Sequence, residues 1–303
     1  MAAPTPTTSP STPTAAASTG TNTPGARTKR RSRGSWTYHS FMVVAALLWF
    51  APILWMISMA VTPNDVLQQS SSDLLPRSVT LENLVSVFAT GDLGRWFLNS
   101  AVVTAVTTAV TVIFSAMAGY AFAKISFPGR RLLFVIVLAG LMVPKEAMFV
   151  PLFLMFSGAH GQNSYEALIL PRLAAPLGVF IMTQFFSKVP AEVEEAARID
   201  GAGRWRVFFE IMLPLARPAM ASLAIFTFVL TWNDYLWPLV ISTKTEWFTV
   251  TTGLASLQSN FAATTNLGDL MARGLIGSLP LLIIFLAFQR QLIRGITLGS
   301  GEK

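Results

Sequence analysis

The chain has 303 residues, of which 52% are apolar and 12% charged, and its mean hydropathy is +0.55. Soluble domains usually carry about 25% charged residues, so this composition excludes a water-facing globule and indicates a membrane protein. The absence of cysteine excludes disulfides, thiol catalysis and cysteine zinc sites. The two histidines, His39 and His160, have no carboxylate at ligand spacing, so no metal site is predicted.

The net charge of +7 is concentrated near the amino terminus. The first 35 residues contain no acid and are rich in Thr, Ser, Pro and Ala, and their five basic residues are Arg27, Lys29, Arg30, Arg31 and Arg33. Such a segment cannot bury enough apolar area to offset its ordering entropy. We therefore predict that residues 1–35 form a disordered basic cytoplasmic tail beside anionic lipid. No aromatic-rich basic groove accompanies it, so no nucleic-acid partner is expected.

Six apolar stretches follow. Residues 41–61 are free of charge, and 21 residues of helix are long enough to cross a hydrocarbon core of about 30 Å. A signal peptide is the alternative for this stretch, but it is longer than the usual apolar region of about 7–15 residues. Further spans are predicted at 97–123, 132–155, 167–187, 217–241 and 271–290. The predicted fold class is all-α, a polytopic membrane protein with six transmembrane helices within residues 36–303.

Several of these spans carry interruptions. Lys145 and Glu146 follow Pro144 in the third, and Arg172 lies behind Pro171 in the fourth. The sixth has only 16 residues between its boundary arginines, Arg273 and Arg290, whose side chains are expected to snorkel toward the membrane surface.

Basic residues fix the predicted orientation. With the amino terminus inside, the inner segments hold sixteen of the 22 basic residues, and the outer segments hold four. By the positive-inside rule, both termini and the loop at 188–217 face the cytoplasm.

The 188–217 loop has the pattern of a charged helical hairpin. Pro190 suits a first helical turn, and the acids that follow it, including Glu195, lie near the positive end of the helix dipole. Gly201 and Gly203 are expected to stop the first helix, and a second short helix is expected to run until Pro214 breaks it. Without any family resemblance, this residue pattern favours an amphipathic hairpin that lies on the membrane surface.

The residues of this loop also carry a resemblance. Glu195-Ala-Ala, three residues and Gly201, followed by Ile211 and Leu213-Pro214, resemble the cytoplasmic signature (EAA motif) of ATP-binding-cassette (ABC) importer permeases. Trp232-Asn-Asp-Tyr-Leu-Trp-Pro238 and Phe127-Pro-Gly129 are similar to segments of the carbohydrate-transporting, maltose-type (MalG-like) branch. The resemblance covers about residues 41–298 and leaves the first 35 without a counterpart.

The resemblance implies a docking role for the hairpin, in which a separate ATPase grips it. The residues it implies for ATPase coupling are Glu195, Ala196, Ala197, Asp200, Gly201, Ile211 and Pro214. Glu195 would face basic or polar groups of the ATPase, Ala196 and Ala197 would permit close packing, and Gly201 would give the bend. The implied partners are a second permease subunit in a heterodimer, two ATP-binding subunits, an extracytoplasmic solute-binding protein and membrane lipid.

The chain has no Gly-(four residues)-Gly-Lys-Ser/Thr sequence to cradle phosphate. ATP hydrolysis is therefore expected on a separate chain. No cofactor is expected to bind here, and ATP and Mg²⁺ belong to the partner. The chain is predicted to be a transport subunit rather than an enzyme.

The fifth span holds the candidate substrate pathway. Asn233 and Asp234 lie past its midpoint, where a carboxylate is costly unless it faces a cavity or a partner. Trp232 and Tyr235 have rings that could stack on sugar faces. Two alternatives stay open: the aromatics form an interfacial belt, and Asp234 caps a helix or pairs with an arginine.

Together these patterns predict an importer permease for a sugar or related solute in the inner or plasma membrane of a prokaryote. An ion-gradient-driven secondary transporter is the alternative. It would be supported by paired intramembrane carboxylates or repeated broken helices, whereas Asp234 and Glu146 are isolated. A membrane-embedded enzyme is disfavoured because the chain lacks a nucleophile elbow and convergent acid pairs.

Overall fold

The fold is described from a computed structural model of the whole chain, which defines residues 34–69, 76, 78–89, 92–158, 161–260 and 266–299. Nearly all of the predicted basic tail, together with His160 and Lys303, lies outside the described residues, and the last two tail positions already belong to a helix. The chain divides into two units, residues 1–50 and 51–303.

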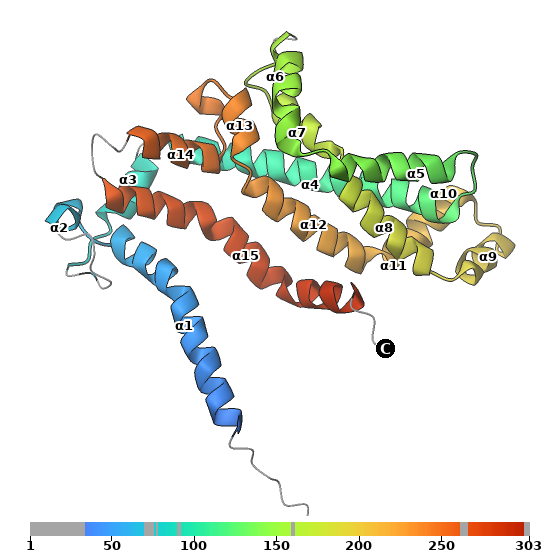
Figure 1. Cartoon of the computed structure of the whole chain (residues 1–303), viewed down its shortest axis with the longest axis horizontal. Coiled ribbons are helices and arrows are strands. Elements are labelled where there is room, and N and C mark those ends of the chain that lie inside the picture. Colours follow the sequence, from blue (N-terminus) through green and yellow to red (C-terminus); the bar gives the residue numbers. More distant parts are fainter. Residues whose placement is uncertain are drawn as a thin grey trace, which may run out of the picture. The chain divides into compact units, whose positions relative to one another are not determined.

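The described residues form helices and no strands, so the all-α fold class is confirmed (Figure 1). In chain order the α-helices are α1 Gly34–Ala60, α2 Asn64–Gln69, α3 Glu82–Ala89, α4 Asp92–Lys124, α5 Arg130–Ala139, α6 Phe149–Gly158, α7 Tyr165–Leu173, α8 Pro176–Lys188, α9 Ala191–Ile199, α10 Arg204–Arg206, α11 Leu213–Leu215, α12 Arg217–Trp232, α13 Leu236–Ile241, α14 Val250–Asn260 and α15 Leu267–Gly299. A π-helix, Val207–Met212, joins α10 to α11, and short 3₁₀ turns lie at Gly140–Met142, Lys145–Met148 and Thr245–Trp247.

Three helices of the described part are long and apolar enough to cross a membrane as single spans, Tyr38–Ala60, Leu93–Lys124 and Leu267–Gln289. Three further candidates are bent pairs: 130–142 with 145–158 at 93°, 165–173 with 176–188 at 44°, and 204–215 with 217–232 at 71°. If each bent pair is one span, the number reaches the six that the sequence predicts.

The predicted fifth span, 217–241, is wrong as one continuous helix. α12 ends at Trp232, and the separate helix α13 begins at Leu236. Asn233, which follows α12, has φ −84° and ψ −2°, and its side-chain amide donates to the carbonyl of Val229, which ends the helix locally.

The expected snorkelling of Arg273 is also wrong. α15 extends beyond the predicted sixth span at both ends, which places Arg273 inside the helix. Its side chain is buried, and its Nε lies 2.8 Å from the Asp269 carboxylate one turn earlier. Pairing within the helix compensates the charge, so the side chain has no need to reach the membrane surface.

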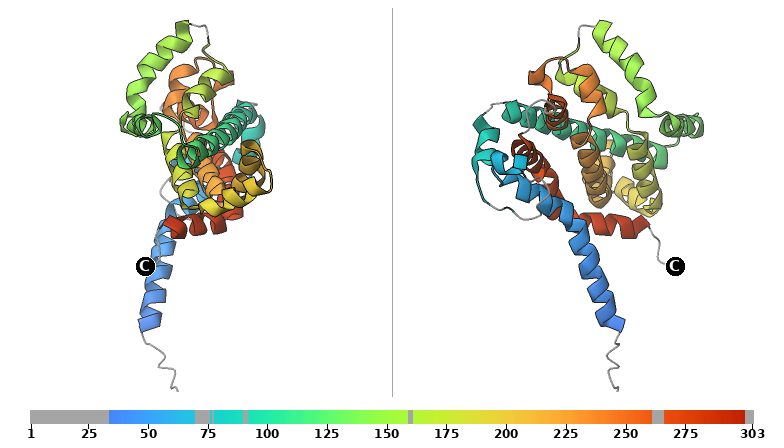
Figure 2. Two further views of the ribbon diagram at one scale, coloured as in Figure 1. Left: turned by 90° about the vertical axis from the view of Figure 1, so that its right-hand side faces the viewer. Right: turned by 60° about the vertical axis from the view of Figure 1, so that its left-hand side comes forward.

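Close packing of α4 against α8 forms the centre of the second unit. α4, α8 and α12 lie side by side in Figures 1 and 2. Glycines allow the approach: a Cβ added at Gly119 would stand 2.5 Å from the Cβ of Met182, and one at Gly178 would stand 2.3 Å from the Ser115 hydroxyl. Small residues at a helix interface let the backbones come together, as is common in membrane helices.

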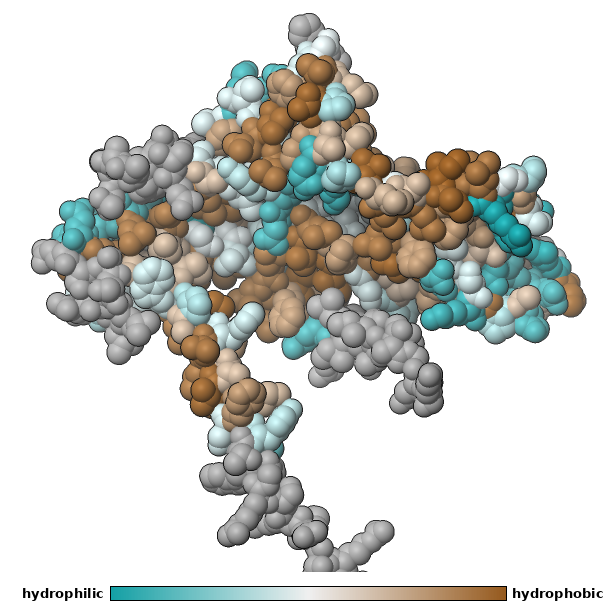
Figure 3. All heavy atoms as spheres, viewed as in Figure 1, coloured by the Kyte–Doolittle hydropathy of each residue, from teal (hydrophilic) through white to brown (hydrophobic). Residues whose placement is uncertain are grey.

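The outer surfaces of the helices are apolar. α1 exposes large side chains, including Trp49 at 82% and Leu48 at 75%. In the second unit, apolar residues cover much of the face shown in Figure 3, whereas hydrophilic residues gather over the end formed by α9 and α10. An apolar surface of this kind suits a lipid environment, and the hydrophilic end suits water.

Candidate functional site: the helical hairpin and the paired helix breaks

The segment from Pro190 to Ala216 is a hairpin of two limbs. The first limb is α9, whose first turn carries Glu192 and Glu194 near the positive end of the helix dipole. Gly201 ends it with φ +80°, a left-handed conformation that suits glycine. The amide of Ala202 then donates to the carbonyl of Ala197 at 2.9 Å, which closes the helix end.

The second limb differs from its prediction. Pro214 was expected to break it, but the helical path continues through Pro214 to Leu215 and bends at Ala216 instead. The π-helix at 207–212 immediately precedes the proline. A wider π turn moves the carbonyl that the proline ring would otherwise meet, and a proline donates no backbone hydrogen bond there.

The outward face of the hairpin combines acids with large apolar groups. Glu195, Ala196, Asp200 and Gly201 are exposed. Ile199 is 86% exposed and Trp205 68%, and the Trp205 ring stacks on that of Phe209, which is also exposed. In Figure 1 this end, with α9 and α10, lies at the far right of the second unit. Exposed aromatic and aliphatic side chains beside charges are typical of a surface that binds another protein.

The inward face of the hairpin holds three of the predicted coupling residues, Ala197, Ile211 and Pro214. Ala197 is buried and packs in the chain's own core with Phe208 and Met212, and Ile211 packs against the same cluster. Ala197 therefore contributes to packing within the chain. Pro214 is half-buried in the second limb.

Sequence reasoning missed Glu194, which is 5% exposed. Its carboxylate lies 4.0 Å from the ammonium of Lys124, the last residue of α4, and 3.4 Å from the guanidinium of Arg198. One signal was available in the sequence: Glu194 shares a helical face with Val193 and Ala197, which is an unusual place for an acid.

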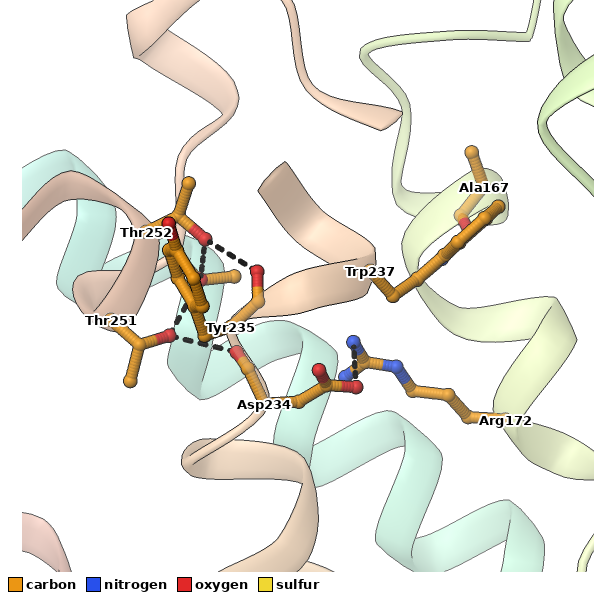
Figure 4. Close-up of polar contacts among 8 residues, drawn as sticks. Ala167, Arg172, Asp234, Tyr235, Trp237, Thr251 and Thr252 are labelled. Atoms are coloured by element: carbon orange, nitrogen blue, oxygen red, sulfur yellow. Dashed lines mark hydrogen bonds and ion pairs between the residues drawn. The ribbon is translucent and has the colours of Figure 1, made fainter. Parts of the chain in front are cut away.

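A second polar site lies where two helices are broken. Arg172 is near the end of α7, just before the break at Ala174–Ala175, and Asp234 lies in the break between α12 and α13. The two side chains point toward each other in Figure 4, with 2.7 Å between Nη2 and Oδ2. One of the alternatives predicted for Asp234 was pairing with an arginine, and the structure shows this pairing with Arg172.

The Arg172 side chain is only 11% exposed, and it needs this counter-ion. No described residue accepts a hydrogen bond from its guanidinium, so the ion pair with Asp234 is the compensation that the described residues give this charge. The ion pair thus connects the end of α7, next to the α7–α8 break, to the break between α12 and α13.

The other pathway residues divide by exposure. Trp232 is 4% exposed, stacks on Phe228 and donates from its indole to the carbonyl of Gly277. Its ring is therefore a packing group here and is not open to a sugar. Asn233 and Tyr235 are exposed, and the backbone carbonyls of Asp234 and Tyr235 accept hydrogen bonds from Thr251 and Thr252 (Figure 4).

Residues 112–298 match the family described as the binding-protein-dependent transport system inner membrane component. The match runs from the middle of α4 to the end of α15 and includes the whole hairpin. The chain belongs to this family.

Two relatives of this permease carry sugar names. The arabinooligosaccharides transport system permease protein AraQ of Bacillus subtilis is 36% identical over 263 residues, covering 86% of this chain and 93% of the relative. The diacetylchitobiose uptake system permease protein NgcG of Streptomyces coelicolor is 34% identical over 265 residues, covering 86% and 87%.

A solved structure has the same fold. It is a bacterial ABC transporter involved in the import of the acidic polysaccharide alginate, with a TM-score of 0.74 and 20% identity, covering 85% of this permease and 95% of that chain.

Family and fold together confirm several expectations. The chain is a multi-pass membrane permease of the ABC importer type, a transport component rather than an enzyme. The comparisons give no support to an ion-gradient-driven transporter.

Proposed function

We propose that this permease carries a sugar across the cell membrane and that its hairpin receives a separate ATPase. The observation that carries the proposal is the outward face of the hairpin. There Glu195 and Asp200 stand beside Ile199 and Trp205, and all four are exposed. A surface with acids and a large aromatic suits a partner that has both a basic group and an apolar cleft.

The chain requires other subunits for this function. It contains no phosphate-cradling sequence, so ATP and Mg²⁺ bind to two ATP-binding subunits, and this chain binds no cofactor. A second permease completes the pathway as a heterodimer, and an extracytoplasmic solute-binding protein delivers the cargo. ATP and the loaded binding protein act on different conformations of the permease, and their differential affinities drive the switch between them.

The proposed location is the inner or plasma membrane of a prokaryote, with both termini and the hairpin in the cytoplasm. The distribution of basic residues supports this orientation, because sixteen of 22 fall in the inner segments. The hydrophilic surface over α9 and α10 in Figure 3 is consistent with a hairpin in water.

The proposed cargo class is a short oligosaccharide. The names of the two relatives refer to arabinooligosaccharides and to diacetylchitobiose, and both relatives match along most of their length. Exposed Asn233 and Tyr235, beside Asp234, offer hydrogen bonds and a ring face to such a cargo.

The test is uptake into vesicles that contain the whole complex, with arabinooligosaccharides and diacetylchitobiose as separate probes. Glu195→Lys combined with Gly201→Asp places a cation and a second charge on the outward face. We expect this double variant to abolish ATP-coupled uptake while the permease still inserts. Glu192→Gln, an exposed change on the same helix, is the matched control and should leave uptake unchanged. Normal uptake by the double variant would refute the docking role.

A further inference from the structure

Two neighbouring carboxylates of α9, Glu194 and Glu195, face opposite ways. Glu195 is exposed on the outward face, whereas Glu194 lies beneath it at 5% exposure. Burying a carboxylate is costly unless a counter-ion or hydrogen bonds compensate it. The residues that compensate the Glu194 charge therefore show which parts of the chain α9 contacts.

Glu194 has two counter-ions: Arg198 lies one turn later in α9, and Lys124 comes from a distant part of the chain. Lys124 ends α4, and its ammonium lies 4.0 Å from the Glu194 carboxylate, with both side chains largely buried. The same ammonium donates a hydrogen bond to the carbonyl of Val189, in the linker between α8 and α9. A single side chain therefore connects the end of α4 to the beginning of the hairpin.

An aromatic layer supports this ionic contact. Tyr120 lies one turn before Lys124 and is buried. Its ring is 5.7 Å from that of Phe186 in α8 and 5.1 Å from that of Phe208 in the second limb of the hairpin. Both limbs of the hairpin thus contact the same end of α4, one through charge and one through ring packing.

We infer that Glu194 and Lys124 are positioning residues that make the end of α4 move together with the hairpin. This inference rests on the proposed function, because the movement is imposed by the ATPase. α4 packs along α8 and α12. A displacement of its end is therefore passed into the core of the unit as a rigid-body movement.

The absence of cysteine permits a direct test by spin labelling. Labels at Glu192→Cys on α9 and Ser126→Cys just beyond α4 occupy exposed positions. The distance between them is measured by pulsed electron paramagnetic resonance in the full complex, without nucleotide and with ATP and vanadate. We expect the same distance in both states, because the two elements move together. In Glu194→Gln and in Lys124→Met, we expect the distance to shift between the states.

Two control variants separate positioning from general disruption. Lys124→Arg keeps the cation and should retain the fixed distance. Arg198→Met removes the exposed partner of the same carboxylate, whose side chain is 56% exposed, and should also retain it. A distance that shifts in the unaltered complex, or that stays fixed in both Glu194→Gln and Lys124→Met, would overturn the inference.

The outcome also separates this inference from the proposed function. If no ATPase associates with the unaltered permease, the proposed function itself fails. If the complex assembles and hydrolyses ATP but the labels do not respond as described, only the role of Glu194 and Lys124 is wrong.

Discussion

Gly201 shows how a single backbone conformation shapes the hairpin. Its φ of +80° lies in the region that disfavours side chains, and a Cβ there would meet no other atom. We expect Gly201→Ala to destabilise the hairpin by about 1 kcal/mol through backbone strain alone. Hydrogen exchange of the α9 amides in the purified permease would report this as faster local opening.

Gly203 provides the matched control for that experiment. A Cβ at Gly203 also meets no other atom, but its φ is −69°. Gly203→Ala should therefore leave the exchange of α9 amides unchanged. Equal effects of both alanines would mean that the conformation of Gly201 is not what holds the turn.

The ion pair between Asp234 and Arg172 makes a second prediction for single residues. Asp234→Asn removes the counter-ion of a mostly buried guanidinium. We expect a loss of about 2 kcal/mol in stability, as for a hydrogen bond to a charged group, visible as a lower melting temperature in detergent. Arg172→Met combined with Asp234→Asn should recover part of the loss, since no unpaired charge remains. A double variant as unstable as the sum of its single changes would contradict this pairing.

Helix packing yields a prediction at the scale of elements. Gly119→Ala would place a Cβ 2.5 Å from the Cβ of Met182 and 2.8 Å from its backbone, so α4 and α8 must separate. We expect a loss of about 1–3 kcal/mol from this overpacking. Gly94→Ala, in the same helix but with open space around it, should have little effect on thermal unfolding. Similar melting temperatures for the two variants would contradict the close approach.

The predicted elements were right where apolar length decided the structure. Spans such as 97–123 are long, uncharged and free of competing signals, so helix formation in a membrane follows from composition. The breaks were harder to predict. The Asn233 amide folds back on its own helix and ends α12, and the π-helix carries the chain past Pro214. Both outcomes depend on local hydrogen bonds that hydropathy does not encode.

The candidate site was predicted only in part for a similar reason. The motif located the hairpin, but a motif does not state which side of a helix faces the core. Ala197 and Glu194 both turn inward, because α9 packs against residues of α4 and of the second limb that are distant in sequence. Trp232 is buried for the same reason, since its neighbours come from α4 and α15.

At the scale of the whole molecule, the chain combines an apolar, helix-packed body with a hydrophilic hairpin at one end of its second unit (Figure 3). The family and the fold make it an importer permease. Its sequence contains no Gly-(four residues)-Gly-Lys-Ser/Thr loop to cradle the phosphates of ATP, and the proposed function places ATP on separate subunits. Transport by this chain is therefore expected to depend on subunits that bind the hairpin.

The most direct test of this dependence is oligosaccharide uptake by vesicles of defined composition. One set contains this permease alone, and the other contains it with the second permease, the ATPase and the binding protein. With arabinooligosaccharides and diacetylchitobiose as separate probes, we predict oligosaccharide uptake only by the complete vesicles and only when ATP is supplied to the side that faces the hairpin. Uptake by the permease alone, driven by a proton or sodium gradient, would contradict the account.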